Sequence, residues 1–418
     1  MSKEKRRVPK LRFPGFTEDW EQRKLGEIFE YLQNNTLSRD SLNYKNPNVK
    51  NIHYGDILVK FDEILDGFSK DIPYINSEFD LSKFSKSLLR DGDIVFSDTA
   101  EDDTVGKVIE LQNVNAPFIL GGLHTIPCRP LISFGKGYLG NFLNSDSYRL
   151  QLRPLIQGIK VSSISKSALK DTMIEYPKNL DEQEKIGSLF YYIAKMITLH
   201  QRKLEHLNLK KKALLQKLFP KNGERYPELR FPEFTDAWEQ RKLRDYLSIP
   251  EREVLEVKSA NDLLTVKLNL GGVELGASRD TLSLGATVYY KRYAGQFIYG
   301  KQNFFNGSMG IIPQNLDGKG SSGDVPSFNI SNIEANYLYT YVSRESYWRP
   351  KVAAASGTGS KRIHEKTLLD FNIDVPSINE QKLISNTFDL INRFITLHQR
   401  KLEHLKLQKK ALLQQLFV

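Results

Sequence analysis

Apolar side chains recur at alternating steps of four and three residues along two stretches of the chain. The first series runs through Ile186, Phe190, Ile193, Ile197, His200, Leu204, Leu207, Lys211, Leu214 and Leu218. The second series runs through Ile384, Phe388, Ile391, Ile395, His398, Leu402, Leu405, Lys409, Leu412 and Leu416. A seam of this period, sustained over more than four heptads, is typical of a coiled coil. The pattern predicts two long helices, which would most simply pack on each other as an antiparallel pair.

Residues that favour helix termini mark the ends of these helices. We expect Asp181 and Asn379 to be the N-caps, with Glu184 completing a capping box behind Asp181. Pro220 should end the first helix, because proline cannot continue the backbone hydrogen bonding.

Two polar residues interrupt each seam, and they do so at matching places. These are His200 and Lys211 in the first helix and His398 and Lys409 in the second. A polar seam position commonly fixes the register of a coiled coil. Metal binding by the histidines is the alternative, but no second ligand follows either one at the fourth residue. We therefore interpret all four positions as register devices or partly hydrated seam positions.

The helices are part of a longer internal repeat. Residues 197–220 and 395–418 differ at only four positions, and residues 9–25 (PKLRFPGFTEDWEQRKL) are similarly close to 227–243 (PELRFPEFTDAWEQRKL). The segments between are unlike each other, and both contain short β-rich runs broken by Gly, Pro, Asn and Asp. The chain is therefore an internal repeat of two copies, with similar flanking segments and dissimilar segments between them.

This repeat predicts mixed α/β (α+β, β-rich) globules, two long helices and a pseudo-two-fold arrangement. We expect a first globule over 1–180, a helix over 181–220, a second globule over 221–378 that includes the segment 227–243, and a helix over 379–418. Inside the globules, residues 118–127 align without gaps to 304–313. Gly158 and Gly357 each stand 19 residues before a proline.

Length, charge and cysteine content indicate what kind of protein and partner to expect. The chain has 418 residues, long enough for two cores, and its 60 Lys and Arg against 50 Asp and Glu give a net charge of +10. This excess favours a polyanionic partner such as nucleic acid, although simple solubility would also account for it. Cys128 is the only cysteine, which excludes a disulfide framework. No apolar run reaches about 18 residues, so we expect a cytoplasmic protein without a membrane span.

The common catalytic motifs are absent from the sequence. There is no P-loop, no G-x-G-x-x-G after a strand, no H-E-x-x-H and no G-x-S-x-G. The acidic residues Asp98, Glu101, Asp102 and Asp103 could hold a divalent ion, but such loops are more often solvated surface. We expect no catalytic residue and no metal ion in this chain, and these absences favour binding over catalysis.

Several loops carry residues suited to DNA. Hydroxyl and basic side chains that could position phosphates are Thr358, Ser360, Lys361 and Arg362 in one Gly/Ser loop, and Lys160, Ser162, Ser163 and Lys166 in its counterpart. Candidates for reading bases are Lys291, Arg292, Tyr293, Lys301, Gln302 and Asn303 in the second globule, and Lys107, His124 and Thr125 in the first. Helix-entry turns and ordinary surface are the alternative interpretations. The basic face of the repeated helix could be a solvated flank or could lie near phosphates.

The repeated motifs resemble those of the specificity subunit of type I restriction–modification systems. The resemblance rests on FPxFTxxWEQRKL at 13–25 and 231–243, GDIVFS at 92–97 with VGK at 105–107, the Pro…Glu-Gln segments after Pro177 and Pro376, and the LxHQRKLExLxxxKKALLQxLF helices. It implies two target-recognition domains that each read half of a bipartite double-stranded DNA sequence. The second globule has no Gly-Asp-Ile phrase like that at Gly92, which leaves the strand-by-strand equivalence of the globules open.

The same resemblance implies a division of labour. The helices would set the spacing and dock two methyltransferase subunits, and restriction–translocase subunits would join them. S-adenosylmethionine, ATP and Mg²⁺ would then bind those partners, with no cofactor in this chain. A coiled-coil scaffold that does not touch DNA is the alternative function. A helix over 181–218 would be about 57 Å long at about 1.5 Å per residue, which could hold the two globules one to one-and-a-half DNA turns apart.

Overall fold

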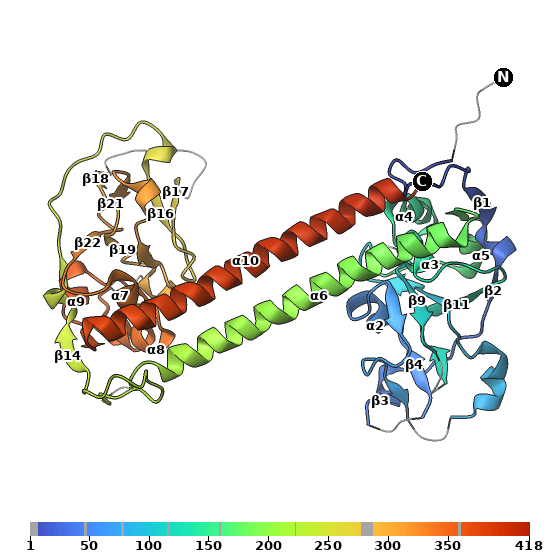
Figure 1. Ribbon diagram of the computed structural model, residues 1–418, viewed down its shortest axis with the longest axis horizontal. Helices are drawn as coiled ribbons and strands as arrows, with labels where there is room; N and C mark the ends of the chain where they lie inside the picture. The colour runs from blue at the N-terminus through green and yellow to red at the C-terminus, as the bar shows by residue number, and fades with distance from the viewer. Residues whose placement is uncertain are drawn as a thin grey trace. The chain divides into compact units, whose positions relative to one another are not determined.

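The computed structural model describes residues 7–45, 48–76, 79–114, 118–158, 160–221, 223–276, 287–357 and 361–418. The chain forms two compact units, Met1–Arg202 with Gln399–Val418, and Lys203–His398. Two long helices, α6 (Leu180–Lys217) and α10 (Ile378–Leu416), each begin in one unit and end in the other (Figure 1). Within the described residues, none of the helices combines the length and apolarity needed to cross a bilayer.

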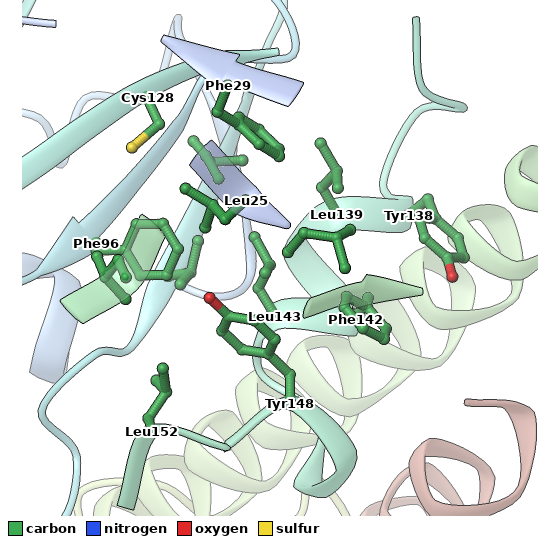
Figure 2. Packing of buried hydrophobic residues seen from close by; sticks show 14 of the residues in the cluster. Leu25, Phe29, Phe96, Cys128, Tyr138, Leu139, Phe142, Leu143, Tyr148 and Leu152 are labelled. Atoms are coloured by element: carbon green, nitrogen blue, oxygen red, sulfur yellow. The ribbon is translucent and has the colours of Figure 1, made fainter. Parts of the chain in front are cut away.

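The first unit is built on a five-stranded sheet. Its strand order is β2 (Phe29–Tyr31), β11 (Thr125–Pro130), β7 (Ile94–Ser97), β9 (Val108–Gln112) and β5 (Ile64–Asp66), and all pairs are antiparallel except β5 with β9. The helices α3 (Tyr138–Leu143) and α4 (Asp146–Leu152) supply the other side of its core. In Figure 2, Phe96 and Cys128 from the sheet and Leu143 and Tyr148 from the helices lie in this core.

Shorter elements complete the first unit. A four-stranded sheet has the order β10 (Ile119–Gly121), β4 (Lys50–Ile52), β6 (Tyr74–Ile75) and β3 (Leu42–Asn43). The remaining elements are β1 (Glu21–Lys24), which pairs with β13 (Met173–Tyr176), β8 (Thr99–Ala100), which pairs with β12 (Ser162–Ser163), the helices α1 (Leu25–Ile28), α2 (Tyr54–Val59) and α5 (Lys166–Lys170), and the 3₁₀ turns η1 (Arg39–Ser41), η2 (Leu81–Ser87) and η3 (Arg153–Leu155).

The second unit has a four-stranded sheet of order β15 (Leu247–Ser248), β22 (Ser327–Ile330), β19 (Phe297–Tyr299) and β20 (Met309–Ile311). Its other strands form the pairs β14 (Glu239–Lys242) with β23 (Asn372–Val375), β16 (Leu264–Val266) with β17 (Val273–Leu275), and β18 (Tyr289–Lys291) with β21 (Gly320–Ser322). Its helices are α7 (Ala335–Val342), α8 (Glu345–Trp348) and α9 (Glu365–Leu369), with 3₁₀ turns η4 (Leu243–Asp245), η5 (Ala260–Asp262), η6 (Phe304–Asn306), η7 (Gln314–Leu316) and η8 (Arg349–Ala354).

The strand orders make the two units equivalent over their central sheets. The series β2-β11-β7-β9 in the first unit corresponds to β15-β22-β19-β20 in the second. The alignment of residues 118–127 with 304–313 is therefore wrong, because it matches β11 with β20. The register pairs β11 with both β2 and β7, and it is β22 that pairs with both β15 and β19.

This correspondence also shows which segment of the second globule takes the place of the Gly-Asp-Ile phrase. Gly92 has a φ of 82° and precedes β7, and Gly295 has a φ of 81° and precedes β19. Asp93 and Gln296 follow them and are both buried. Gly-Gln-Phe at 295–297 thus stands where Gly-Asp-Ile stands at 92–94, and the equivalence of the strands holds.

The helix caps differ from the expected ones by two residues. The backbone N–H of Asp181 donates to Oδ1 of Asn179 at 2.8 Å, and that of Glu380 donates to Oγ of Ser377 at 3.4 Å. Asp181 and Asn379 lie inside the first turns of α6 and α10, so they are not the N-caps, and Glu184 is exposed. Both helices start earlier because Asn179 and Ser377 already satisfy the first free N–H groups.

The seam positions are less accessible than the flanks of the helices. Ile193, Ile197, His200, Leu204, Leu207, Leu214, Ile391, Ile395, His398, Leu402, Leu405 and Leu412 are all buried or half-buried. The basic flank residues Arg202, Lys203, Lys210, Lys212 and Lys217 are all exposed. Each helix therefore carries the apolar stripe that its heptad pattern predicts.

The last residues of each long helix complete a core of the unit in which the helix ends. Phe417, after α10, lies against Tyr138, Phe142 and Phe190 in the first unit. Phe219, after α6, lies against Trp238, Tyr337 and Phe388 in the second. The repeated Leu-Phe ending is thus a packing element of each unit.

Candidate nucleic-acid interface

Three segments meet at one end of the central sheet in the first unit: the β7–β9 loop, the residue before β11, and the turn at 157–163. Asp98 joins them through its backbone, because its N–H donates to the carbonyl of His124 at 3.1 Å and its carbonyl accepts from Ile164 N–H at 2.8 Å. Strand β12 of the turn also pairs with β8 of the loop. We call residues 98–107, 124 and 157–166 the first loop surface.

The second unit repeats this arrangement with different residues. Lys301 N–H donates to the carbonyl of Asp324 at 2.9 Å, and the Lys301 carbonyl accepts from Ile363 N–H at 3.0 Å. Lys301 therefore stands where Asp98 stands in the first unit, and Asp324 stands where His124 stands. We call residues 301–307, 324 and 356–365 the second loop surface.

Glycines shape the turn in each surface. Gly158 and Gly357 have φ values of 109° and 105°, and bridges from Gln157 to Ser163 and from Ser356 to Arg362 close the two turns. A Cβ on Gly158 would meet the carbonyl oxygen of Val161 at 2.0 Å, so only glycine fits there. The two turns share a glycine of positive φ and a closing bridge, and they carry different side chains at Ser163 and Arg362.

In the first loop surface, an imidazole lies next to a carboxylate. Nδ1 of His124 is 3.3 Å from Oδ1 of Asp98, and the two side chains are 47% and 27% exposed. His124 adopts a φ of 55°, and the ring of Tyr54 meets its ring edge-on at 5.2 Å between centroids. Lys160, Ser163 and Lys166 are exposed around this pair, and Ser162 is half-buried in β12. The surface offers hydrogen-bond donors, acceptors and aromatic faces to a ligand.

In the second loop surface, the charges are placed in the opposite sense. Nζ of Lys301 lies 3.0 Å from Glu365, with both side chains about one-seventh exposed (13% and 15%), and Arg362 Nη1 donates to Asp324 at 3.1 Å. Burial acts to raise the pKa of Glu365, but hydrogen bonds and Lys301 hold it below its ordinary value. Gln302, Asn303 and Lys361 are exposed, while Thr358 and Ser360 lie outside the described residues.

Two of the candidate residues, Arg292 and Thr125, are buried inside their units. Arg292 is 4% exposed, and its guanidinium donates to Oγ of Ser321 at 2.7 Å and to the carbonyl of Val325 at 3.3 Å. Thr125 is 1% exposed and donates to the carbonyl of Gly122. Neither side chain is open to a DNA base, because its polar atoms already bond inside the unit. Arg292 instead supports the segment that carries Asp324.

Lys107 is also directed into its own unit. Its Nζ donates to the carbonyls of Leu58 and Phe61 at 3.2 and 2.9 Å, and burial lowers its pKa. The neighbouring candidates Lys291 and Tyr293 both bond Glu253, which belongs to none of the three segments that make the second loop surface. The structure therefore brings together only part of the candidate set.

The residues that the sequence analysis did not single out are Tyr54, Asp324 and Glu365. Glu365 could have been found from spacing alone, because it follows Gly357 by eight residues, as Lys166 follows Gly158. Asp324 could not, because its place depends on pairing β22 with β19. Tyr54 comes from α2, which has no counterpart signal in the repeat.

The acidic residues of the β7–β9 loop have local partners. Asp102 accepts from the N–H of Thr104 at 2.9 Å, and Asp98 lies beside His124 as described. Over the part of the chain that the structure describes, no three His, Cys, Asp or Glu side chains are grouped to hold a metal ion.

Known proteins share both the sequence pattern and the fold. A family model described as the type I restriction modification DNA specificity domain matches residues 17–209 and 284–407. The putative type I restriction enzyme MjaX specificity subunit of Methanocaldococcus jannaschii is 25% identical over 412 residues, which cover 95% of this chain and 92% of the relative. The MjaVIII specificity subunit of the same organism is 21% identical over 434 residues, which cover 96% and 92%.

A solved structure agrees with this assignment at the level of the fold. The crystal structure of the type I restriction–modification S subunit from M. genitalium matches with a TM-score of 0.60 and 13% identity, over 98% of this chain and 99% of that one. The family model covers well over half of the chain. The protein therefore belongs to the type I restriction–modification DNA specificity family and is a specificity subunit of such a system.

Proposed function

We propose that the two loop surfaces read the two halves of a bipartite, asymmetric DNA target. The observation that carries this proposal is that one backbone arrangement presents different side chains in the two units. Asp98 and Lys301 occupy one equivalent place, His124 and Asp324 the next, and Ser163 and Arg362 a third. Two surfaces of one shape and opposite charge pattern suit two different short sequences.

Within each surface, the exposed side chains divide by chemistry. Lys160, Lys166 and Lys361 position phosphates, because they are exposed ammonium groups, on the two turns and at the start of α5. His124 in the first surface, and Gln302 and Asn303 in the second, read base edges. A scaffold that makes no contact with DNA would have no use for this division.

The remaining components belong to partner proteins in this proposal. This chain is non-catalytic, and two methyltransferase subunits and the restriction–translocase subunits bind it. S-adenosylmethionine, ATP and Mg²⁺ serve those partners. The relatives' own names, which call them specificity subunits of restriction enzymes, support this division.

Methylation-motif sequencing of a host that expresses the chain with its partners tests the division into halves. The Gln302→Ala/Asn303→Ala variant should change the preferred bases in one half-site only. His124→Asn, which keeps a residue tolerant of positive φ, should change the other half-site only. If either variant altered both halves, or if neither altered any, the assignment of one half-site to each surface would be wrong.

Salt dependence separates phosphate contacts from base contacts. Lys361→Ala should weaken binding to all sequences and reduce the slope of log K against log salt by about one. A change in base preference with the slope intact would contradict the phosphate assignment. Strong salt dependence of the wild-type complex on random duplex DNA would also exclude the scaffold function.

The long helices set the spacing in this proposal. At 38 residues, α6 is about 57 Å long, enough to hold two readers more than one DNA turn apart. Deleting one heptad from 197–217 should change the length of the non-specific gap and leave both half-sites intact. A footprint with the original gap would disprove this spacing role.

A further inference from the structure

The same lysine occurs in both copies of the repeated helix, as Lys409 in α10 and Lys211 in α6. In the first unit, Lys409 has a carboxylate partner. Its Nζ lies 2.8 Å from both carboxylate oxygens of Glu63, and the two side chains are only 17% and 21% exposed. Burial acts to raise the pKa of Glu63, but Lys409, a backbone hydrogen bond and Lys107 together lower it below its ordinary value. The positive charge of Lys409 is therefore balanced by a carboxylate of the same unit.

A second hydrogen bond joins α10 to the first unit. Nε2 of Gln414, which follows Lys409 by five residues, donates to Oδ2 of Asp146 at 2.9 Å. The corresponding residues of the second unit are Gln216 and Glu345, which begins α8 as Asp146 begins α4. The carboxylate of Glu345 pairs with Arg349 at 2.6 Å.

In the second unit, Lys211 faces an open cavity of about 750 Å³. Among the residues that the structure describes in this unit, no carboxylate oxygen lies within 4.0 Å of its Nζ. Burial lowers the pKa of Lys211, as expected for an ammonium group that is partly removed from water without a counter-ion. The position that Glu63 fills for Lys409 is open here.

The walls of the cavity combine positive charge with apolar surface. Lys212, Arg349 and Glu345 line it together with Leu215, Phe305 and Trp348. Arg344 also contributes, but its guanidinium is held between the rings of Phe219 and Tyr341, at 4.2 and 4.1 Å. Arg349 is paired with Glu345, so the cations left to a ligand are the half-buried Lys211 and the exposed Lys212.

We propose that this cavity receives an acidic side chain, flanked by apolar residues, from a protein partner. The first unit supplies the pattern, because Glu63 reaches Lys409 from a segment in which Phe61 and Ile64 stand close by in sequence. A DNA phosphate fits less well, because Leu215, Phe305 and Trp348 line the cavity. Of its four cations, Arg344 is held by aromatic rings and Arg349 by Glu345. The partner is a subunit of the same assembly, so the inference rests on the proposed function.

The experiment compares assembly of the chain with its methyltransferase subunit for wild type, Lys211→Met and the matched control Lys210→Met, because Lys210 does not line the cavity. We expect Lys211→Met to weaken association about 30-fold, the change that corresponds to loss of a desolvated charge pair. Lys210→Met, one residue away and exposed, should change it little. The thermal midpoint of the free Lys211→Met chain should stay level or rise, which separates lost docking from misfolding. Lys409→Met should lower that midpoint, because it strands Glu63.

Each other outcome overturns the inference. If Lys211→Met weakened only DNA binding by the assembled complex, the ligand would be a phosphate. If it changed neither association nor DNA binding, the cavity would have no partner. If Lys211→Met lowered the thermal midpoint of the free chain, the lysine would have an internal counter-ion. Failure of the wild-type chain to bind the methyltransferase at all would instead contradict the proposed function.

Discussion

Trp20 in the first unit and Trp238 in the second have the same surroundings, although 218 positions separate them. Each is buried, and each meets a buried tyrosine, Tyr138 or Tyr337, at 6.0 Å between ring centroids. The hydroxyls of these tyrosines donate to equivalent carbonyls, of Glu175 and Asp374. The loop surfaces agree in none of their side chains at the equivalent places described above.

This contrast follows from burial. We call the buried residues that the two units share, such as Trp20 and Trp238, the frame of each unit. A frame residue touches many neighbours at close-packed density, so a change in its volume or polarity lowers the stability of the fold. A loop residue such as Gln302 is exposed, and its identity affects the fold little. One frame can therefore be kept while the loops change, and the two units represent two outcomes of that freedom.

The largest loss of stability is expected from substitutions at the ends of the long helices, where Phe219 and Phe417 pack into the cores of the units. Phe219→Ala and Phe417→Ala should each destabilise their own unit by about 4 kcal/mol, because each removes a buried ring and leaves a cavity. Phe219→Ala should cost about 1 kcal/mol more, since its ring also lies 4.2 Å from the Arg344 guanidinium. Hydrogen exchange measured separately over 7–202 and 227–398 checks both values.

The control for this pair is Phe68→Ala, because Phe68 is 55% exposed. It should leave exchange in both units near the wild-type level. Loss of protection in the first unit after Phe219→Ala would show that the end of α6 is not a packing element of the second unit alone.

Breaking the equivalent buried ion pair should destabilise each unit by the same amount. Arg12 bonds Glu182 through two contacts of 2.7 and 2.8 Å, and Arg230 bonds Glu380 at 2.9 and 2.8 Å. Each glutamate is 1% exposed and each arginine 14%. Glu182→Gln and Glu380→Gln should each cost about 2 kcal/mol, because a charge-assisted pair is broken while the arginine keeps some access to water.

Urea denaturation followed by exchange within each unit measures these two losses. The exposed Glu184→Gln variant serves as the reference and should be near neutral. Unequal losses from the two frame variants, by more than about 1 kcal/mol, would mean that the frames are less alike in energy than in geometry.

The helix caps offer a smaller test of the same equivalence. Asn179→Ala should cost about 1 kcal/mol, and Ser377→Ala less, because the Ser377 bond is longer at 3.4 Å than the Asn179 bond at 2.8 Å. Asn379→Ala should change stability by no more than a few tenths of a kcal/mol if Asn379 is not the cap. Thermal unfolding of the three variants gives the order directly.

The helices were predictable from the sequence because a period of 3.5 is visible in single residues. Their exact starts were not, because Asn179 and Asp181 are both good capping types and the choice depends on the chain that leads into the helix. The equivalence of β7 and β19 was missed for a similar reason. What the two strands share is a positive φ at Gly92 and Gly295 and burial after it, while the residue types differ.

The loop surfaces were predictable in part. The two glycine turns and the loop at 301–303 were identified from residue type, and the structure joins them through the backbone of Lys301. The burial of Arg292 was not predictable, because it depends on Ser321 and Val325 from a distant strand and loop. An exposed and a buried arginine look alike in a sequence, since only the tertiary fold decides which polar groups surround the guanidinium.

The smallest expected effect distinguishes the units by pH. Among the described residues, a buried histidine caps a helix in the first unit and not in the second: His53 is 8% exposed, and its Nδ1 accepts from the N–H of Gly55 at 3.2 Å. Burial lowers its pKa from about 6.5, and Arg39 and His124 lower it further, against an opposing pull from Asp56. The unfolded chain therefore binds a proton that the folded unit resists, and stability should be lost as the pH falls through 6.5.

Asparagine at this position isolates the titration. His53→Asn keeps a side-chain acceptor for Gly55 N–H and removes the ionisable group. Exchange in the first unit should then vary less between about pH 7 and 5.5 than in wild type, because the proton uptake of the unfolded state at this site is gone. Exchange in the second unit should follow the same pH curve in both proteins. Equal pH dependence of the first unit in wild type and variant would show that His53 does not titrate differently in the two states, and the two units would then respond to acid alike.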